Sequence, residues 1–208
     1  MKEIVVAKVG GSVARRNVER IKGVMDELSL ASRVVVIPGG WVFADFSRLI
    51  DLRLKLGNKT AHRLGIMSME MYAEVLLGTS QEFERAKTNE LRFESGGKYV
   101  LMPYSSKLYE LLPESWEVTS DSVTVWIANE LRSRYRVRVI KITDVDGIYV
   151  NGKLVEKIRA EKVKGCLDSY SLKLIRKYGI SVFVCNGVVE GRVKSYIVEG
   201  QTLGTLVY

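Results

Sequence analysis

The 208-residue sequence has one histidine, two cysteines and three prolines, and lacks any long apolar run. A single histidine, His62, excludes a histidine-rich metal site and leaves at most one Ser–His or Cys–His pair. Cys166 and Cys185 form no CxxC motif, so we expect two reduced thiols. The longest clean apolar stretches, residues 4–7 and 34–37, fall far short of the roughly 20 residues of a membrane helix. We expect a cytoplasmic protein without a targeting segment or a membrane partner.

The charge balance favours an anionic ligand. Lys and Arg outnumber Asp and Glu by 32 to 24, a formal net charge of +8. Arg132, Arg134, Arg136 and Arg138 alternate before an apolar run, as on a solvated face. No motif that reads DNA or RNA accompanies them, so we expect no nucleic-acid partner. At 47% hydrophobic residues the chain can bury a large core, which predicts one domain over residues 1–208.

Short β-branched runs alternate with helical periods along the chain. Strands separated by helices need crossover connections, which predicts an α/β fold with a mostly parallel sheet and helices on both faces. The predicted strands are residues 3–9, 33–37, 99–102, 137–142, 181–184 and 205–207, and the predicted helices are residues 13–28, 44–56, 61–77, 120–131 and 169–178.

Three segments carry further structural predictions. Met67 and Met71 share a helical stripe, which we assign to core packing. Residues 78–97 are polar and charged, and we expect a surface excursion there. The dipeptide Asn151-Gly152 is the strongest hairpin signal in the chain.

The most informative segment is Lys8-Val9-Gly10-Gly11-Ser12, at a predicted strand-to-helix junction. Glycines let backbone N–H groups approach an anion closely, and a helix start adds free donors and a positive dipole end. Lys8 adds a mobile positive charge. The segment fits phosphate binding; a plain tight turn with Lys8 in solvent is the alternative. Neither GxxxxGK[ST] nor GxGxxG occurs, which disfavours P-loop enzymes and standard dinucleotide-binding dehydrogenases.

A second glycine turn, Pro38-Gly39-Gly40, follows the next predicted strand. Ligands of such folds bind beyond the carboxyl ends of the strands, so we expect the two turns to face one cleft. Arg48 on the following helix is suited to a phosphate or carboxylate, and it fits a solvated helix face equally well.

Acidic residues occur at two further junctions. Asp121 follows Ser120 at a predicted helix start, where it could be an ordinary cap or a carboxylate that orients lysines or holds a metal. Asp144 and Asp146 follow Lys141 in a turn, where they could serve only as turn formers.

Taken together and in chain order, these motifs resemble the amino acid kinase superfamily, which includes acetylglutamate, carbamate, isopentenyl phosphate and uridylate kinases. The resemblance spans nearly the whole chain and is closest to a small archaeal subgroup that includes the aminomethyl-furanmethanol phosphate kinase of methanofuran biosynthesis. The segments that carry the superfamily resemblance are Lys8-Val-Gly-Gly-Ser12, Pro38-Gly-Gly40, Thr119-Ser-Asp-Ser122, Lys141-Ile-Thr-Asp-Val-Asp-Gly-Ile-Tyr149 and Gly204-Thr205. The subgroup resemblance rests on the stretch from Gly39-Gly40 to Ala61-His62, with Phe43-Ala-Asp45 and Arg48, and on Ser115-Trp-Glu-Val-Thr-Ser-Asp121.

The resemblance implies a three-layer αβα sandwich, with ATP and Mg²⁺ over roughly residues 115–208 and the acceptor over the early strands. It implies a homo-oligomer and no protein metal ligands. Lys8 would bind the transferred phosphoryl group, Lys141 would lie at the ATP phosphates, and Asp121 would orient the lysines. The implied phosphate-binding residues are Gly10, Gly11 and Ser12, the acceptor-binding residues are Gly39, Gly40, Asp45, Arg48 and His62, and the nucleotide-binding residues are Thr143, Asp144, Asp146, Gly147 and Tyr149.

The sequence departs from this family at two places. Trp41 stands where the second turn commonly has a third glycine, and we expect its indole to narrow the acceptor pocket. Cys166-Leu-Asp168 replaces the glycine–methionine–lysine element of the amino acid members, which disfavours acetylglutamate, carbamate and aspartate as substrates.

The scarcity of histidine fits a phosphorylated acceptor. A phosphate monoester has a second pKa of about 6 and is ionised at neutral pH without a general base. We therefore expect an ATP-dependent kinase that converts a monophosphate, best an aminomethyl-furanmethanol phosphate, into a diphosphate. The alternatives are a uridylate-type nucleoside monophosphate kinase and a non-catalytic nucleotide-binding regulatory or storage protein on the same fold.

Overall fold

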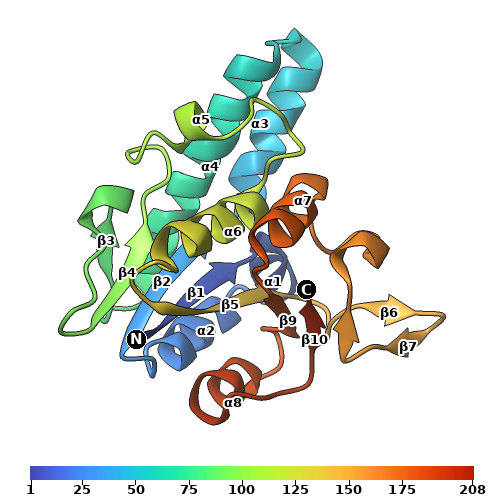
Figure 1. Cartoon of the computed structure of the whole chain (residues 1–208). Helices are drawn as coiled ribbons and strands as arrows, with labels where there is room; N and C mark the ends of the chain where they lie inside the picture. Colours follow the sequence, from blue (N-terminus) through green and yellow to red (C-terminus); the bar gives the residue numbers. More distant parts are fainter.

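The computed structural model describes residues 1–208 as a sheet between two layers of helices (Figure 1). The eight strands have the order β3-β4-β2-β1-β5-β9-β10-β8, and neighbouring strands are parallel except β9 and β10. The predicted fold class is confirmed. The strands are β1 (Glu3–Val9), β2 (Arg33–Pro38), β3 (Glu84–Ala86), β4 (Gly97–Leu101), β5 (Arg136–Thr143), β8 (Lys157–Ile158), β9 (Val182–Asn186) and β10 (Thr205–Val207).

Two hydrophobic cores cover the two faces of the sheet. Along β1, Ile4 and Val6 point into one core, and Val5 and Ala7 into the other, because successive side chains of a strand alternate between faces. Helices α6 (Ser120–Leu131) and α7 (Ser169–Tyr178) cover the first core, and α2 (Arg20–Leu28) and α8 (Arg192–Glu199) cover the second.

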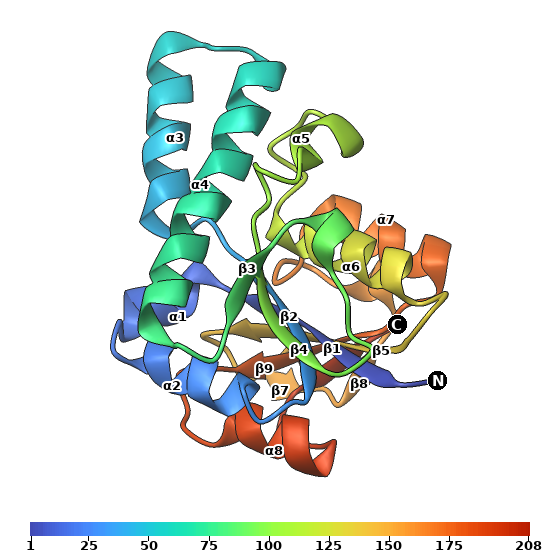
Figure 2. The same ribbon diagram turned by 90° about the vertical axis from the view of Figure 1, so that its left-hand side faces the viewer.

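A helical hairpin projects from the sheet beside the carboxyl end of β2. It consists of α3 (Trp41–Leu54) and α4 (Asn58–Thr79), which lie side by side and antiparallel in Figure 2. Lys55 has φ of 51° and Gly57 has φ of 81°, which reverse the chain between the helices. None of the helices combines the length and apolar character that crossing a lipid bilayer requires.

The predicted helix 13–28 is wrong as one element. The structure has α1 (Gly11–Arg16), then a break, then α2. Asn17 adopts an extended backbone, and its side chain accepts a hydrogen bond from Glu19 N at 3.1 Å. Val18, which completed the apolar period in the sequence, is exposed.

The core assignment of the Met67 and Met71 stripe is also wrong. These side chains are 41% and 52% exposed, whereas Met69 and Tyr72 of the same helix are buried. The helix buries the face next to the stripe, because Met69 and Tyr72 pack into the two cores of the sheet and Ser68 contacts Ser47 of α3.

Residues 78–97 are more than a surface excursion. They contain edge strand β3, and Phe93 in this segment is fully buried. The sequence also gave no signal for the short α5 (Leu108–Leu111) or for α8. The hairpin is confirmed: β6 (Tyr149–Val150) and β7 (Lys153–Leu154) pair antiparallel, with left-handed φ values at Asn151 and Gly152.

Two arginines of the alternating run have structural partners. Arg138 donates to the carbonyls of Tyr196 and Ile197, each at 3.1 Å, at the end of α8. Arg132 donates to the carbonyl of Tyr178 at the end of α7. Cations at these positions satisfy carbonyls that a helix leaves unpaired.

Candidate active site

Two lysines and one aspartate form the centre of the site. Lys8 and Lys141 are register partners in the adjacent strands β1 and β5, so their side chains leave the sheet side by side. Asp121, in the first turn of α6, receives both: its Oδ1 lies 3.1 Å from Lys8 Nζ, and its Oδ2 accepts a 2.6 Å hydrogen bond from Lys141 Nζ. The structure thus brings the three predicted catalytic residues together.

The two ammonium groups are not equivalent. Lys141 also donates to the carbonyl of Cys166, so two protein oxygens hold it. Lys8 has a single protein partner, Asp121 Oδ1 at 3.1 Å. Its remaining N–H groups are therefore the free donors of this centre.

Burial and the electrostatic interactions among Lys8, Asp121 and Lys141 shift the pKa values of all three groups. Burial by itself would raise the pKa of Asp121, but Lys141 and Lys8 together lower it to about 2. Burial lowers the pKa of Lys8, and Asp121 offsets this only in part because the charge of Lys141 acts in the same direction as burial. For Lys141, burial alone would lower the pKa, but attraction to Asp121, their hydrogen bond and smaller contributions from Cys166 and Asp168 together raise it.

The two glycine turns pack directly against each other. A Cβ on Gly11 would lie 2.5 Å from the Cα of Trp41, and a Cβ on Gly39 would lie 2.9 Å from Gly11 N. Neither position has room for a side chain. The predicted juxtaposition of the two turns is what the structure shows.

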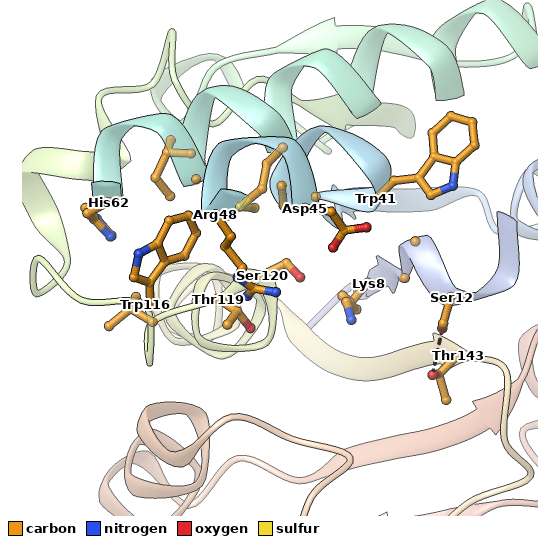
Figure 3. Close-up of a pocket in the computed structure, with 18 of the residues that line it drawn as sticks. Lys8, Ser12, Trp41, Asp45, Arg48, His62, Trp116, Thr119, Ser120 and Thr143 are labelled. Carbon is orange, nitrogen blue, oxygen red and sulfur yellow. Dashed lines mark hydrogen bonds between the residues drawn. The ribbon is translucent and has the colours of Figure 1, made fainter. Parts of the chain in front are cut away.

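The structure corrects the role expected of Gly10. Its N–H donates to the carbonyl of Ile142 at 2.9 Å and is not available to a phosphate. The N–H of Gly11, at the start of α1, has no backbone partner and stays free. Ser12 Oγ lies 3.1 Å from Thr143 Oγ1 at the same edge of the cavity (Figure 3).

A cavity of about 480 Å³ opens over these groups. In Figure 3 it extends from Lys8, Ser12 and Thr143 past Asp45 and Arg48 to Trp116 and His62. One end is cationic and rich in glycine, and apolar side chains line the other. The lining residues are Lys8, Gly10, Gly11, Ser12, Arg15, Lys141 and Thr143 near the lysines, and Gly40, Trp41, Ala44, Asp45, Arg48, His62, Gly65, Ile66, Met69, Ser115, Trp116, Val118, Thr119 and Ser120 beyond them.

Of the residues predicted for the acceptor, all but Gly39 line this cavity. Asp45 forms an ion pair with Arg15, which links α3 to α1. His62 is only 3% exposed, and its Nε2 has no hydrogen-bond partner. Burial lowers the pKa of His62 against the opposing effect of the Ser115 carbonyl, so its imidazole is neutral at pH 7.

The expected narrowing of the pocket by Trp41 is not observed. The residue begins α3 with a φ of 44°, where a glycine would be unstrained. Its indole packs on Tyr72 and Phe43, with ring centroids 5.4 and 5.8 Å away, and extends away from Lys8 (Figure 3).

The residues predicted for the nucleotide lie at the end of β5 and just beyond, and only Thr143 lines the cavity. Asp144 pairs with Arg16 at 3.2 Å, and Asp146 with Arg192 at 3.0 Å. A Cβ on Gly147 would lie 3.0 Å from Thr205 N, which joins this turn to the terminal strand. Tyr149 is half exposed.

Comparison with known proteins agrees with this geometry. No family model matches the chain. The [5-(aminomethyl)furan-3-yl]methyl phosphate kinase of Methanocaldococcus jannaschii is 31% identical over 207 residues, covering 94% of this chain and 93% of that protein. The chain belongs to the amino acid kinase superfamily.

Other members of the superfamily are more distant. Uridylate kinase of Methanoculleus marisnigri is 27% identical over 237 residues, covering 100% of this chain and 96% of that protein. The structures of uridylate kinase from Archaeoglobus fulgidus and of an isopentenyl phosphate kinase share the fold with TM-scores of 0.76 and 0.65, at 18% and 16% identity, over 98% or more of both chains. Because its relatives in the superfamily are kinases, we conclude that the chain is a phosphotransferase.

The sequence patterns did not identify the role of Asp168, a carboxylate that holds the candidate site together. Asp168 accepts hydrogen bonds from the backbone and hydroxyl groups of Thr119 and Ser122 and from Ser171 N, at 2.6–3.3 Å. It thereby caps α7 and ties down the start of α6, which carries Asp121. Its position before a predicted helix was the only local signal.

The donors of this site suit an anionic group such as a phosphate. The free N–H of Gly11, the ammonium of Lys8 and the start of α6 at Ser120 all border the same cavity. No three Asp, Glu, His or Cys side chains gather as metal ligands, and Asp121 is paired with both lysines. Mg²⁺ fits this site as an ion that nucleotide phosphates bring.

Proposed function

We propose that the protein is a cytoplasmic, ATP-dependent kinase that transfers the γ-phosphoryl group to the phosphate of a small organic monophosphate, giving a diphosphate. The observation that carries this proposal is the free ammonium group of Lys8, held by Asp121 beside the glycine turns at one end of a single cavity. Mg²⁺, when bound with ATP, neutralises charge on the phosphates.

In this proposal an oxygen of the acceptor's phosphate attacks the γ-phosphorus, the bond to the β-bridging oxygen breaks, and ADP leaves. No proton has to be removed, because the acceptor is already ionised. Lys8 and the Gly11 N–H stabilise charge on the transferred group. Lys141 holds Asp121, and Asp121 holds Lys8. Thr143, next to Ser12, lies on the side of the cavity where the nucleotide would bind.

The far end of the cavity supports an acceptor that carries both a phosphate and an amino group. Arg48 is a cation suited to the phosphate, and Asp45, which pairs with Arg15, is the single carboxylate among the lining residues. Apolar contacts from Ile66, Met69 and Val118 surround the remaining space. We propose [5-(aminomethyl)furan-3-yl]methyl phosphate, the compound in the name of the 31% identical relative, as the acceptor.

A uridylate-type activity is the second candidate, because a uridylate kinase aligns over the whole chain. The cavity offers few free polar groups for a uracil and a ribose. The Thr119 hydroxyl is bonded to Asp168, and the Ser115 hydroxyl accepts from Glu117 N. A nucleoside would depend on the remaining free groups, such as Arg48 and His62 Nε2, and any of its polar groups left unpaired would cost affinity.

Steady-state assays with [5-(aminomethyl)furan-3-yl]methyl phosphate, UMP and isopentenyl phosphate, with mass detection of the diphosphate, test this choice. We expect the highest kcat/KM with the furan compound, and a D45N variant should raise the KM for that acceptor without raising the KM for isopentenyl phosphate. A higher kcat/KM with UMP would replace the first candidate with the second.

We further propose a homo-oligomer that forms through the back of the α3–α4 hairpin. Val42, Phe46 and Leu49 follow a helical spacing on α3 and are 46%, 64% and 49% exposed. They lie away from the cavity-lining side of the helix, as Met67 and Met71 do on α4. An apolar surface of this kind marks an interface more often than a solvated face.

A further inference from the structure

Trp116 lies in the loop before α6, yet α3 and α4 hold its side chain. Its Nε1 donates to Asp51 Oδ2 at 2.9 Å. A Cβ on Gly65 would lie 3.3 Å from Cζ3 of Trp116, so α4 accommodates the indole because residue 65 has no side chain. A glycine inside a long helix costs about 1 kcal/mol relative to alanine, and the indole gives it a structural reason.

The fixed indole in turn contacts Arg48. The guanidinium carbon lies 5.1 Å from the centroid of the Trp116 ring, and both side chains line the cavity. Figure 3 shows Arg48 next to Trp116, on the side toward Ser120 and Lys8. No carboxylate pairs with Arg48, so its N–H donors are available to a ligand.

The stack on Trp116 orders the Arg48 side chain before the acceptor binds. Arginine has many rotamers, and fixing them during binding lowers affinity. A planar guanidinium stacks well on an aromatic face, which restricts those rotamers and leaves the N–H groups at its rim free.

We propose that Trp116 is a positioning residue that holds the Arg48 guanidinium ready for the phosphate of the acceptor, and that Asp51 and Gly65 fix Trp116 in place. The inference rests on the proposed function, in which Arg48 binds that phosphate. Trp116 thereby acts on affinity for the acceptor through Arg48, and has no part in the transfer step.

A double-mutant cycle measures this dependence. The KM for [5-(aminomethyl)furan-3-yl]methyl phosphate is determined at saturating ATP for the wild type, W116A, R48A and the double variant. We expect W116A to raise this KM about tenfold, equivalent to ~1.4 kcal/mol, and to change kcat and the KM for ATP by less than about twofold. W116A should add nothing in the R48A background, because interactions that act through one residue are not additive.

Two conservative variants separate positioning from folding. W116F loses the donor to Asp51 but keeps an aromatic face for Arg48. We therefore expect it to retain most of the affinity for the acceptor that W116A loses. G65A should raise the acceptor KM severalfold by displacing the indole of Trp116. Alanine has a higher helix propensity than glycine, so this loss would not come from a weakened α4. W126F, a change at an indole of α6 outside the cavity, is the matched control and should behave as the wild type.

A binding measurement covers the case in which a variant or the wild type turns over poorly. In a W41F/W126F background Trp116 is the only indole, and adding the furan phosphate without ATP should change its emission, because Arg48 shifts toward the phosphate. An R48A change should abolish that response.

The outcomes distinguish this inference from the function on which it rests. Absence of turnover with every monophosphate contradicts the proposed function. Normal turnover with equal multiplicative losses for W116A in the wild-type and R48A backgrounds overturns the positioning role, since Trp116 would then contact the acceptor itself. Unchanged acceptor KM in W116A overturns it as well.

Discussion

Lys8 and Lys141 are register partners in β1 and β5, but Lys141 has two protein oxygens as partners and Lys8 has only one. Asp121 contacts both ammonium groups. The strand pairing thus presents, at the same edge of the sheet, one ammonium group held by two oxygens and one that keeps free N–H donors. This asymmetry supports the proposal that Lys8 contacts the transferred phosphoryl group.

The two lysines should therefore respond differently to substitution. We expect K8A to lower kcat by about 10²–10³-fold, the loss typical of removing one preorganised donor, with little loss of stability. K141A should lower both kcat and stability, because it leaves Asp121 and the Cys166 carbonyl without their buried partner. Steady-state kinetics and urea denaturation on the same preparations measure both effects, and equal destabilisation by the two variants would contradict the assignment.

The carboxylate of Asp121 should stabilise the fold in a defined pH range. Its pKa is about 2 in the folded protein, below its ordinary value of 3.8. A depressed pKa gives stability that is present above pH 3.8 and is lost as the pH falls toward 2. We expect D121N to remove on the order of 2 kcal/mol at pH 7.

Urea denaturation of the wild type and D121N at pH 7, 4 and 3 checks this. The difference between their free energies of unfolding should shrink as the pH falls. The exposed Asp26, which pairs with Lys22, provides the control variant D26N. A difference that is independent of pH would mean that Asp121 is not held as a buried anion.

Asp168 should contribute to stability and activity together. Replacing it with alanine removes a helix cap and leaves the donors of Thr119 and Ser122 unpaired. We expect a loss of about 2–4 kcal/mol in the free energy of unfolding, with reduced kcat because α6 carries Asp121. D168N, which keeps one acceptor oxygen, should lose less of each. A kcat that is unchanged in a destabilised D168A protein would show that this cap does not position Asp121.

The back of the helical hairpin should mediate self-association. F46D places a charge at the most exposed aromatic position of α3 and should convert the oligomer to a monomer in sedimentation velocity. L203D, at an exposed leucine near the last strand, is the control and should leave the assembly intact. A monomeric wild type would remove the proposed interface.

Short-range patterns predicted the elements that carry the site. β1 and β5 contain short apolar runs rich in β-branched residues, and the glycines that follow β1 and β2 mark the ligand edge of a parallel sheet. Lys8 and Lys141 occupy equivalent places in these two strands. Their proximity to Asp121 was predicted from the resemblance to the family.

Other features depend on contacts between distant segments. The hydrogen bond of Trp116 with Asp51 spans 65 positions, and no local pattern indicates it. Whether Gly10 offers its N–H to a phosphate depends on the register of β1 with β5, which gives that donor to Ile142. The outward direction of Met67 was decided by the packing of α4 on α3, and the spacing of apolar residues was the same for either face.

The most direct test of the central claim is ³¹P NMR of Mg-ATP mixed with [5-(aminomethyl)furan-3-yl]methyl phosphate, using the wild type and K8A. We predict that the wild type converts the acceptor's monophosphate signal into two coupled diphosphate resonances at the same rate as ADP appears, and that K8A shows almost no conversion. Release of inorganic phosphate without a diphosphate, or equal conversion by K8A, would contradict the account.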